Sequence, residues 1–141
     1  MTEKGKKRLA IIAHGGTIDR LYPVFILASA AAAMDMETHI YFTFWGLTML
    51  RKGAMEKAGL PAMYKHLEEQ LKKKLGEMKY PTPYEMLKRS KATGMLKIYA
   101  CSPTMEMLGV KKEDLIPEVD EIAGAAAFLD IASTADVTLF I

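Results

Sequence analysis

Strand-like apolar runs alternate along this chain with stretches that have the spacing of helices. Arg8–Ala13 and Val137–Ile141 are apolar without a polar alternation, which is typical of strands buried on both faces of a parallel sheet. Strands connected by helices imply right-handed crossovers. We therefore predict an α/β fold, a three-layer α/β/α sandwich with a mainly parallel sheet of about five strands. The remaining predicted strands are Thr38–Phe44, Leu96–Ala100 and Leu115–Ile116, and the predicted helices are Thr17–Met34, Trp45–Gly53, Ser102–Leu108 and Ile122–Ala132.

An extended helical crossover is predicted at about residues 54–94. Its first part carries apolar residues at nearly every fourth position, which indicates one apolar stripe on a basic helix. Thr82 to Glu85 has the pattern of a capping box, with Pro83 suited to the first helical position, so a second helix is expected to start there. The residues of the stripe are Met63, Leu67, Leu71, Leu75 and Met78, in a helix beginning at Pro61.

The length and composition are those of one globular domain over residues 1–141. Half of the 141 residues are hydrophobic and 26% are charged, which is an ordinary balance for a folded protein. The longest apolar run, Val24–Met34, is shorter than the roughly 20 residues that cross a bilayer, so no membrane insertion is expected. A single cysteine and no secretory signal favour a cytoplasmic location.

Charge is distributed unevenly along the chain. Residues 1–50 carry a net +1, residues 51–97 a net +7 and residues 98–141 a net −6, which sum to the overall +2. Opposed segments of this kind suit self-association or a charged partner, although two solvated faces would have the same pattern. Nucleic-acid binding is disfavoured, because the basic residues accompany a helical apolar stripe rather than exposed aromatic residues.

Cys101 is the first candidate for chemistry. It lies between the predicted strand Leu96–Ala100 and a helix for which Ser102 is the expected cap and Pro103 the first helical residue. Helix N–H groups and the helix dipole favour a thiolate there, so its pKa should be low. A lone cysteine has no internal disulfide partner, but it is also a common small core residue. The sequence leaves both interpretations open.

Two more loops follow predicted strands, where ligands bind in α/β sheets. His14-Gly15-Gly16-Thr17 and Trp45-Gly46 are therefore candidate anion- or substrate-binding residues, together with Ser102. His14 is either a partner of the thiolate, if the first and third strands are neighbours, or an ordinary loop histidine. The third glycine of a dinucleotide fingerprint is missing, and His39 and His66 lack companions at metal-ligand spacing, so no cofactor and no metal are expected.

A set of segments spread over nearly the whole chain forms a recognisable pattern. It consists of the glycine–threonine loop after the first strand and the segments Tyr22–Ala28, Tyr41–Leu47, Tyr99–Ser102, Met105–Gly109, Asp120–Ala126 and Ala135–Ile141. Together these segments resemble the DsrE/DsrF-like family, in particular the branch often labelled "peroxiredoxin family protein". The threonine-x-x-cysteine motif of true peroxiredoxins is absent.

The resemblance implies a sulfur-relay protein. Such proteins hold sulfane sulfur or thiosulfate on a cysteine matching Cys101 and pass it to a small carrier of the TusA type. The donor would be thiosulfate or polysulfide. Some relatives have a second cysteine, which is missing here, so transfer to an external thiol is favoured. The alternatives are a non-enzymatic oligomeric module that binds a small anion or nucleotide and, ranked last, a thiol peroxidase. Whether the chain is an enzyme stays open.

The function and the apolar final strand each lead to one structural expectation. Thiol transfer needs access for a second thiol, so Cys101 should be partly exposed. The apolar final strand should leave apolar surface on a monomer, which predicts a homo-oligomer with the Cys101 pocket at or near an interface. The resemblance favours a trimer, because relatives form trimers or larger rings.

Overall fold

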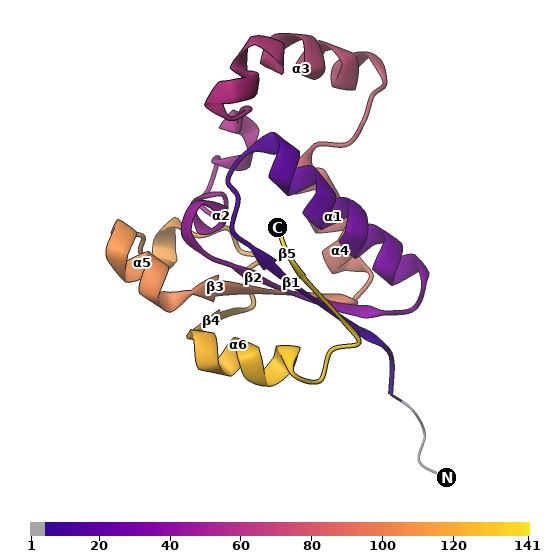
Figure 1. Cartoon of the computed structure of the whole chain (residues 1–141), viewed down its shortest axis with the longest axis vertical. Coiled ribbons are helices and arrows are strands. Elements are labelled where there is room, and N and C mark those ends of the chain that lie inside the picture. Colours follow the sequence, from indigo (N-terminus) through magenta and orange to yellow (C-terminus); the bar gives the residue numbers. More distant parts are fainter. Residues whose placement is uncertain (1–4) are drawn as a thin grey trace.

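A computed structural model describes residues 5–141, which form one five-stranded parallel sheet with helices on both faces (Figure 1). The strand order is β4-β3-β2-β1-β5, and every pairing is parallel. The predicted α/β/α fold is therefore confirmed. The strands are β1 (Arg8–Ala13), β2 (Glu37–Phe42), β3 (Leu96–Cys101), β4 (Glu121–Ala123) and β5 (Val137–Phe140).

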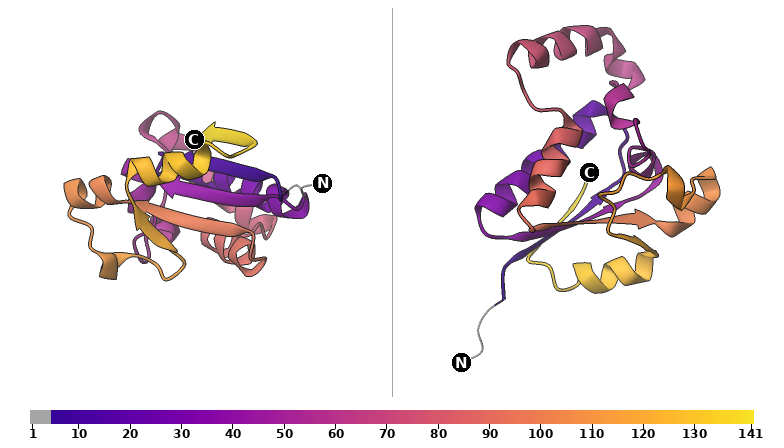
Figure 2. Two further views of the ribbon diagram at one scale, coloured as in Figure 1. Left: turned by 90° about the horizontal axis from the view of Figure 1, so that it is seen from below. Right: turned by 180° about the vertical axis from the view of Figure 1, so that it is seen from behind.

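The helices are divided unequally between the two faces. The long helices α1 and α4 cover one face, and only α6 covers the other (Figures 1 and 2). The short helices α2 and α5 lie at the carboxyl ends of β2 and β3, while α3 stands away from the sheet (Figure 1). The α-helices are α1 (Ile18–Ala33), α2 (Phe44–Thr48), α3 (Glu68–Glu77), α4 (Pro83–Ala92), α5 (Ser102–Leu108) and α6 (Ala125–Ala132), and the 3₁₀ helices are η1 (Met55–Lys57), η2 (Ala62–Leu67) and η3 (Lys112–Asp114).

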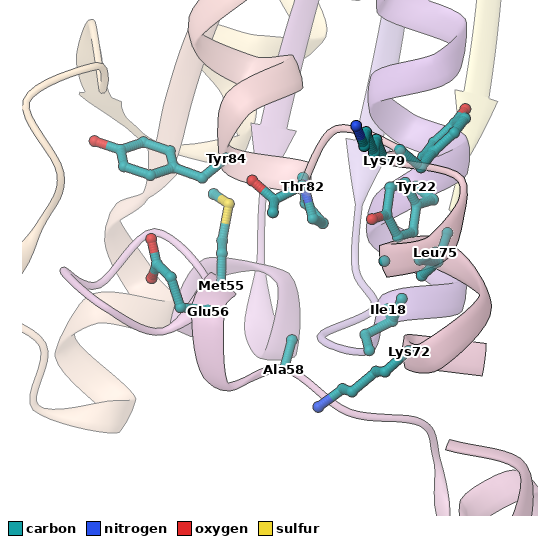
Figure 3. Close-up of a pocket in the computed structure, with 13 residues that line it drawn as sticks. Ile18, Tyr22, Met55, Glu56, Ala58, Lys72, Leu75, Lys79, Thr82 and Tyr84 are labelled. Atoms are coloured by element: carbon teal, nitrogen blue, oxygen red, sulfur yellow. The ribbon is translucent and has the colours of Figure 1, made fainter. Parts of the chain in front are cut away.

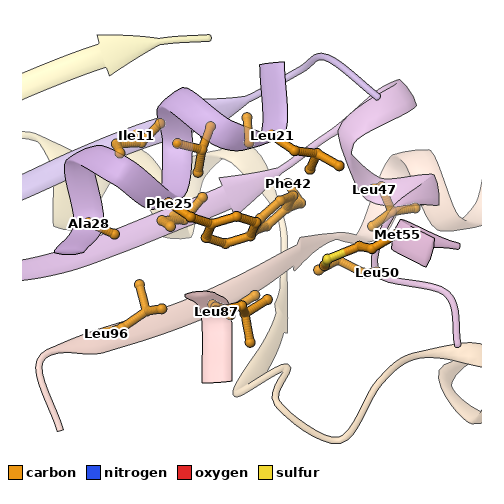
Figure 4. Packing of buried hydrophobic residues seen from close by; sticks show 14 of the residues in the cluster. Ile11, Leu21, Phe25, Ala28, Phe42, Leu47, Leu50, Met55, Leu87 and Leu96 are labelled. Carbon is orange, nitrogen blue, oxygen red and sulfur yellow. The ribbon is translucent and has the colours of Figure 1, made fainter. Parts of the chain in front are cut away.

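Two clusters of buried side chains lie on opposite faces of the sheet. The larger cluster fills the space between the sheet and helices α1 and α4 (Figure 4), where the rings of Phe25 and Phe42 have centroids 6.3 Å apart. The smaller cluster lies under α6 and includes Tyr41, Tyr99 and Cys101. Because successive strand residues point to opposite faces, Ala100 belongs to the larger cluster and Cys101 to the smaller one.

Local signals place most element boundaries correctly. β1 covers the predicted Arg8–Ala13, and α5 ends at Gly109, whose φ of +66° places it in the left-handed region that favours glycine. The cap of α4 is also confirmed, since the Thr82 side chain accepts a hydrogen bond of 3.2 Å from the Glu85 backbone N–H. Thr17 stands at the N-cap of α1, but its side chain makes no capping hydrogen bond.

The fourth strand was predicted at the wrong place. Leu115 forms only an isolated antiparallel bridge with Arg51, and β4 comes later, at Glu121–Ala123. The Asp120 carboxylate accepts hydrogen bonds from the Ile98 backbone N–H and the Lys91 ammonium, which brings the following residues against β3. The predicted helix Ile122–Ala132 is therefore shorter, because its first residues belong to β4 and α6 begins at Ala125.

Two further expectations are wrong. The single basic helix from Pro61 is divided into η2 and α3, and of its apolar stripe Leu71 packs against the core while Met63 and Met78 are exposed. β5 is an edge strand, so it is not buried on both faces as its apolar run suggests: Val137 is 41% exposed and Phe140 is 69% exposed. The second predicted strand also ends earlier, because Phe44 has a φ of +46° and begins α2.

Candidate functional site

Cys101 ends β3 and is the N-cap residue of α5. This position brings the thiol to the carboxyl edge of the sheet, as predicted. Ser102 is the first helical residue instead of the cap, and the side chain of the N-cap residue Cys101 makes no capping hydrogen bond. The sequence therefore located the junction correctly but assigned the capping position one residue too late.

Three hydroxyl groups surround the Cys101 sulfur. The Thr104 hydroxyl donates a hydrogen bond to Sγ at 3.2 Å and accepts one from the Phe44 backbone N–H at 3.1 Å. Burial alone would raise the pKa of Cys101, but hydrogen bonds from Thr104, Thr43 and Tyr41 outweigh it and lower the pKa of the thiol. The site thus favours a thiolate, which is the nucleophilic form of cysteine.

The sulfur is covered on the α6 face of the sheet. Phe128 of α6 is buried, and its ring stacks on Tyr41 with centroids 4.9 Å apart. The hydrogen of the Tyr41 hydroxyl is donated to the backbone carbonyl of Ala123, the residue paired with Cys101 in the sheet, and the Tyr41 oxygen lies near the sulfur. Cys101 is only 6% exposed, so the expected partial exposure is not found in this structure.

The glycine loop after β1 forms a separate pocket of about 530 Å³ at the same edge of the sheet. His14, Gly15, Gly16, Thr17 and Trp45 all line it, so the structure brings these predicted residues together. Cys101 and Ser102 do not line it. The sequence analysis missed four further lining residues, Arg20, Thr48, Phe140 and Ile141.

Close backbone packing joins the glycine loop to α2. A Cβ atom on Gly46 would lie 2.1 Å from the Ala13 carbonyl oxygen, and one on Gly16 would lie 2.6 Å from the Trp45 carbonyl oxygen. The Gly46 N–H also donates to the His14 carbonyl at 2.9 Å. Gly46 is therefore a packing residue that holds the two loops together, and it does not line the pocket.

His14 is not a direct neighbour of the thiol in the sheet. A contact between His14 and the thiolate was expected only if the first and third strands are neighbours, but β2 lies between β1 and β3. The His14 ring instead lies between Phe44 and Phe140, with centroid distances of 5.9 and 5.6 Å. Phe44 connects the two regions, because its backbone N–H contacts Thr104 beside the sulfur.

Residues 5–141 contain no group of three or more His, Cys, Asp or Glu side chains arranged to hold a metal ion. Over the same residues, none of the helices is both long enough and apolar enough to cross a bilayer.

Comparison with known proteins identifies the family. The sequence model of the DsrE/DsrF/DrsH-like family matches residues 5–82 and 58–140. The chain belongs to this family. The sulfur carrier protein DsrE2 of Allochromatium vinosum is 34% identical over 159 aligned positions, covering 96% of this chain and 99% of that protein. The uncharacterized protein YrkE of Bacillus subtilis is 31% identical, with 100% of both chains covered.

Solved structures show the same DsrE-like fold at low sequence identity. The crystal structure of the ychN protein from E. coli has a TM-score of 0.69 and 17% identity, covering 96% of this chain and 99% of that one. The protein MTH1491 of Methanobacterium thermoautotrophicum, of unknown function, has a TM-score of 0.60 and 12% identity, covering 96% and 100%. These structures show the fold alone, whereas the family and the DsrE2 relative support a general role in sulfur relay for this DsrE-like chain.

The hydroxyl residues around Cys101 are the second group that sequence analysis missed. Thr104 lies three residues after the cysteine, in the first turn of a helix, where its side chain can reach back to the N-cap residue. Thr43 directly follows β2, at the same edge of the sheet. The sequence positions of Thr43 and Thr104 could therefore have indicated that they lie near Cys101. The position of Tyr41 could not, because only the pairing of β2 with β3 places Tyr41 beside the sulfur.

Proposed function

We propose that this DsrE-like protein carries sulfur on Cys101 and passes it to the thiol of a partner protein. The observation that carries the proposal is a cysteine at a strand–helix junction with a hydroxyl donating to its sulfur and a lowered pKa. A thiolate is what accepts sulfur from a donor such as thiosulfate or polysulfide. The relative named as a sulfur carrier supports the same role.

The chemistry needs no oxidant or reductant from outside when thiosulfate is the donor. The Cys101 thiolate attacks the outer sulfur of thiosulfate, a new S–S bond forms, and the old S–S bond breaks with its electron pair leaving on sulfite. The product is a persulfide anion on Cys101. A partner thiolate then attacks the outer sulfur of this persulfide, takes it, and leaves the Cys101 thiolate as it began. We propose a small TusA-like carrier of the reducing cytoplasm as this acceptor.

Burial of Cys101 adds one requirement to the mechanism. The acceptor thiol must reach Sγ, but Cys101 lies in the buried cluster under α6 together with Phe128 and Ala123 of β4. We therefore expect α6 and the end of β4 to move aside before transfer. Among residues 5–141, Phe128 is the one buried side chain that belongs to α6. A local movement of α6 away from the sheet would therefore expose little of the core.

Intact mass spectrometry tests this function. Incubation with thiosulfate or polysulfide should add one sulfur atom, and incubation with tetrathionate should add a thiosulfate group; Cys101→Ser should show neither. Addition of a reduced TusA-like carrier should then remove the sulfur and place it on the carrier. An unmodified wild-type protein with all three donors would contradict the proposal, and rapid addition of oxygen from peroxide would favour the thiol peroxidase.

A small-anion-binding module is the second candidate, and one observation favours it. Arg20 lines the His14 pocket beside the backbone of the glycine loop and makes no ion pair within the described residues. The rate of Cys101 alkylation against pH separates the two functions. An apparent pKa at or above the reference of about 8.5 would favour the binding module, and a lower one the carrier.

We also propose a homo-oligomer, with a trimer favoured by the family, in which the carboxyl edge of the sheet lies at or near an interface. The edge strand β5 presents Phe140 at 69% exposure, and Trp45 of the neighbouring loop is 55% exposed. An apolar edge of this kind is stabilised by a second chain. Light scattering should give three times the chain mass, and Phe140→Glu should lower it. The control is Met34→Glu, an equally exposed site (71%) after α1; a monomeric wild type would contradict the proposal.

A further inference from the structure

A second pocket lies between helix α3 and the rest of the domain. Its volume is about 280 Å³, and it opens between the beginnings of α1 and α4, the η1 turn and α3 (Figure 3). Ile18, Met55 and Ala58 at its base belong to the core cluster under α1 and α4, whereas Cys101 belongs to the cluster under α6. The pocket is therefore on the opposite face of the sheet from the proposed sulfur site. Drug-sized ligands occupy roughly 300–1,000 Å³, so this pocket suits a smaller molecule.

The walls of the pocket are mainly apolar. Leu75 of α3 lies over it, and the rings of Tyr22 and Tyr80 contact edge to face with centroids 5.5 Å apart. Ile18, Met55 and Ala58 are buried. Helix α3 has no buried residue. Its apolar side, with Leu75, contacts the rest of the domain at this pocket.

The charged groups lie at separate places around the pocket. Lys79 lies beside Tyr22 at one end, Lys72 of α3 lies at the opposite end near Ala58, and Glu56 lies beside Met55 (Figure 3). Lys72 has one ion pair, at 3.9 Å with Glu68, and Lys79 has none among residues 5–141. Lys79 has a φ of +53°, so a lysine occupies a left-handed position where glycine is usual.

We propose that this pocket binds a small amphipathic monoanion, a carboxylate with a short aliphatic tail. The tail would lie against Ile18 and Leu75, and the carboxylate would pair with Lys79. Glu56 at the other side would repel a second carboxylate, so monocarboxylates should bind more tightly than dicarboxylates of equal length. Such a ligand contacts both α3 and the domain and would hold the two together.

Calorimetric titration with butanoate, hexanoate and octanoate tests the proposal. Binding should saturate at one ligand per chain and tighten about fourfold per methylene until the pocket is full, which corresponds to about 0.8 kcal/mol for each buried methylene. Suberate, with a carboxylate at both ends, should bind more weakly than octanoate. Nuclear Overhauser contacts should connect the octanoate methylenes to the methyl groups of Ile18 and Leu75.

Matched variants separate this pocket from general attraction to a basic helix. The variant Lys79→Gln should weaken octanoate binding about threefold, since one exposed ion pair is lost. The control is Lys74→Gln, which removes the same charge at an exposed position of α3 outside the pocket. Cys101→Ser should bind octanoate unchanged, so the test does not depend on the sulfur chemistry. Binding without saturation, equal loss in both lysine variants, or contacts to another surface would overturn the proposal.

Discussion

Replacing Thr104 by valine is the most direct test of how the protein activates Cys101. The Thr104 side chain is fully buried, and its hydroxyl donates to Sγ at 3.2 Å while accepting from the Phe44 N–H at 3.1 Å. Valine keeps nearly the same shape and removes both of these hydrogen bonds, together with the one of 3.2 Å between the Thr43 and Thr104 hydroxyls. The substitution should therefore raise the pKa of the thiol and lower the stability of the fold, and these two effects are measured separately.

The size of each effect follows from hydrogen-bond energies. A hydrogen bond to a charged group contributes about 1.5–3 kcal/mol, and sulfur is a weak acceptor, so the lower figure applies. A loss of about 1.4 kcal/mol raises the pKa of a thiol by roughly one unit. At a pH well below the pKa of the wild-type thiol, the thiolate fraction then falls about tenfold. Leaving the buried Phe44 N–H without an acceptor should cost a further ~1–3 kcal/mol of unfolding free energy.

The assay is the rate of iodoacetamide alkylation against pH, with the midpoint of the profile as the readout. The midpoint is used because restricted access of the reagent to Cys101 lowers the rate at every pH without moving the midpoint. Thr104→Ser keeps the hydroxyl and should restore the wild-type midpoint. Ser102→Ala changes the same helical turn but removes no hydrogen bond found in the structure, so its midpoint should stay unchanged. A Thr104→Val midpoint equal to that of the wild type, or an equal shift in Ser102→Ala, would refute the reasoning.

Three other predictions concern stability. Gly46→Ala should destabilise the fold by several kcal/mol in urea unfolding, because the new methyl would lie 2.1 Å from the Ala13 carbonyl oxygen; a loss below about 1 kcal/mol would contradict this. Thr82→Ala should cost about 1 kcal/mol through the lost α4 cap, whereas Thr82→Ser should cost little. Acid should also destabilise the protein. Burial lowers the pKa of His39, and hydrogen bonds from neighbouring groups outweigh burial and lower the pKa of Glu37, so the unfolded chain binds more protons than the folded one. The free energy of unfolding should fall below about pH 6.5 and again below about pH 4.5, and His39→Gln should abolish the first fall.

The sequence alone determined the elements that are recorded in local patterns. The apolar run of β1, the cap at Thr82 and the stop at Gly109 depend on residues within a few positions of one another, and all three are found as predicted. The same holds for Cys101 at the junction of a strand and a helix. Such signals are reliable because capping and backbone conformation are decided within one turn of the chain.

Tertiary structure alone decided which of these local features meet. β4 is three residues long with no strand-like pattern, and it forms because Asp120 binds Lys91 and the Ile98 N–H beside the open edge of β3. The strand order separates His14 from Cys101 and brings Tyr41 beside the sulfur. Phe128, from a helix far along the chain, joins the buried cluster that contains the thiol. Contacts between distant segments depend on which backbone edges and apolar faces remain unpaired after local folding, and periodicity along the chain carries no record of that.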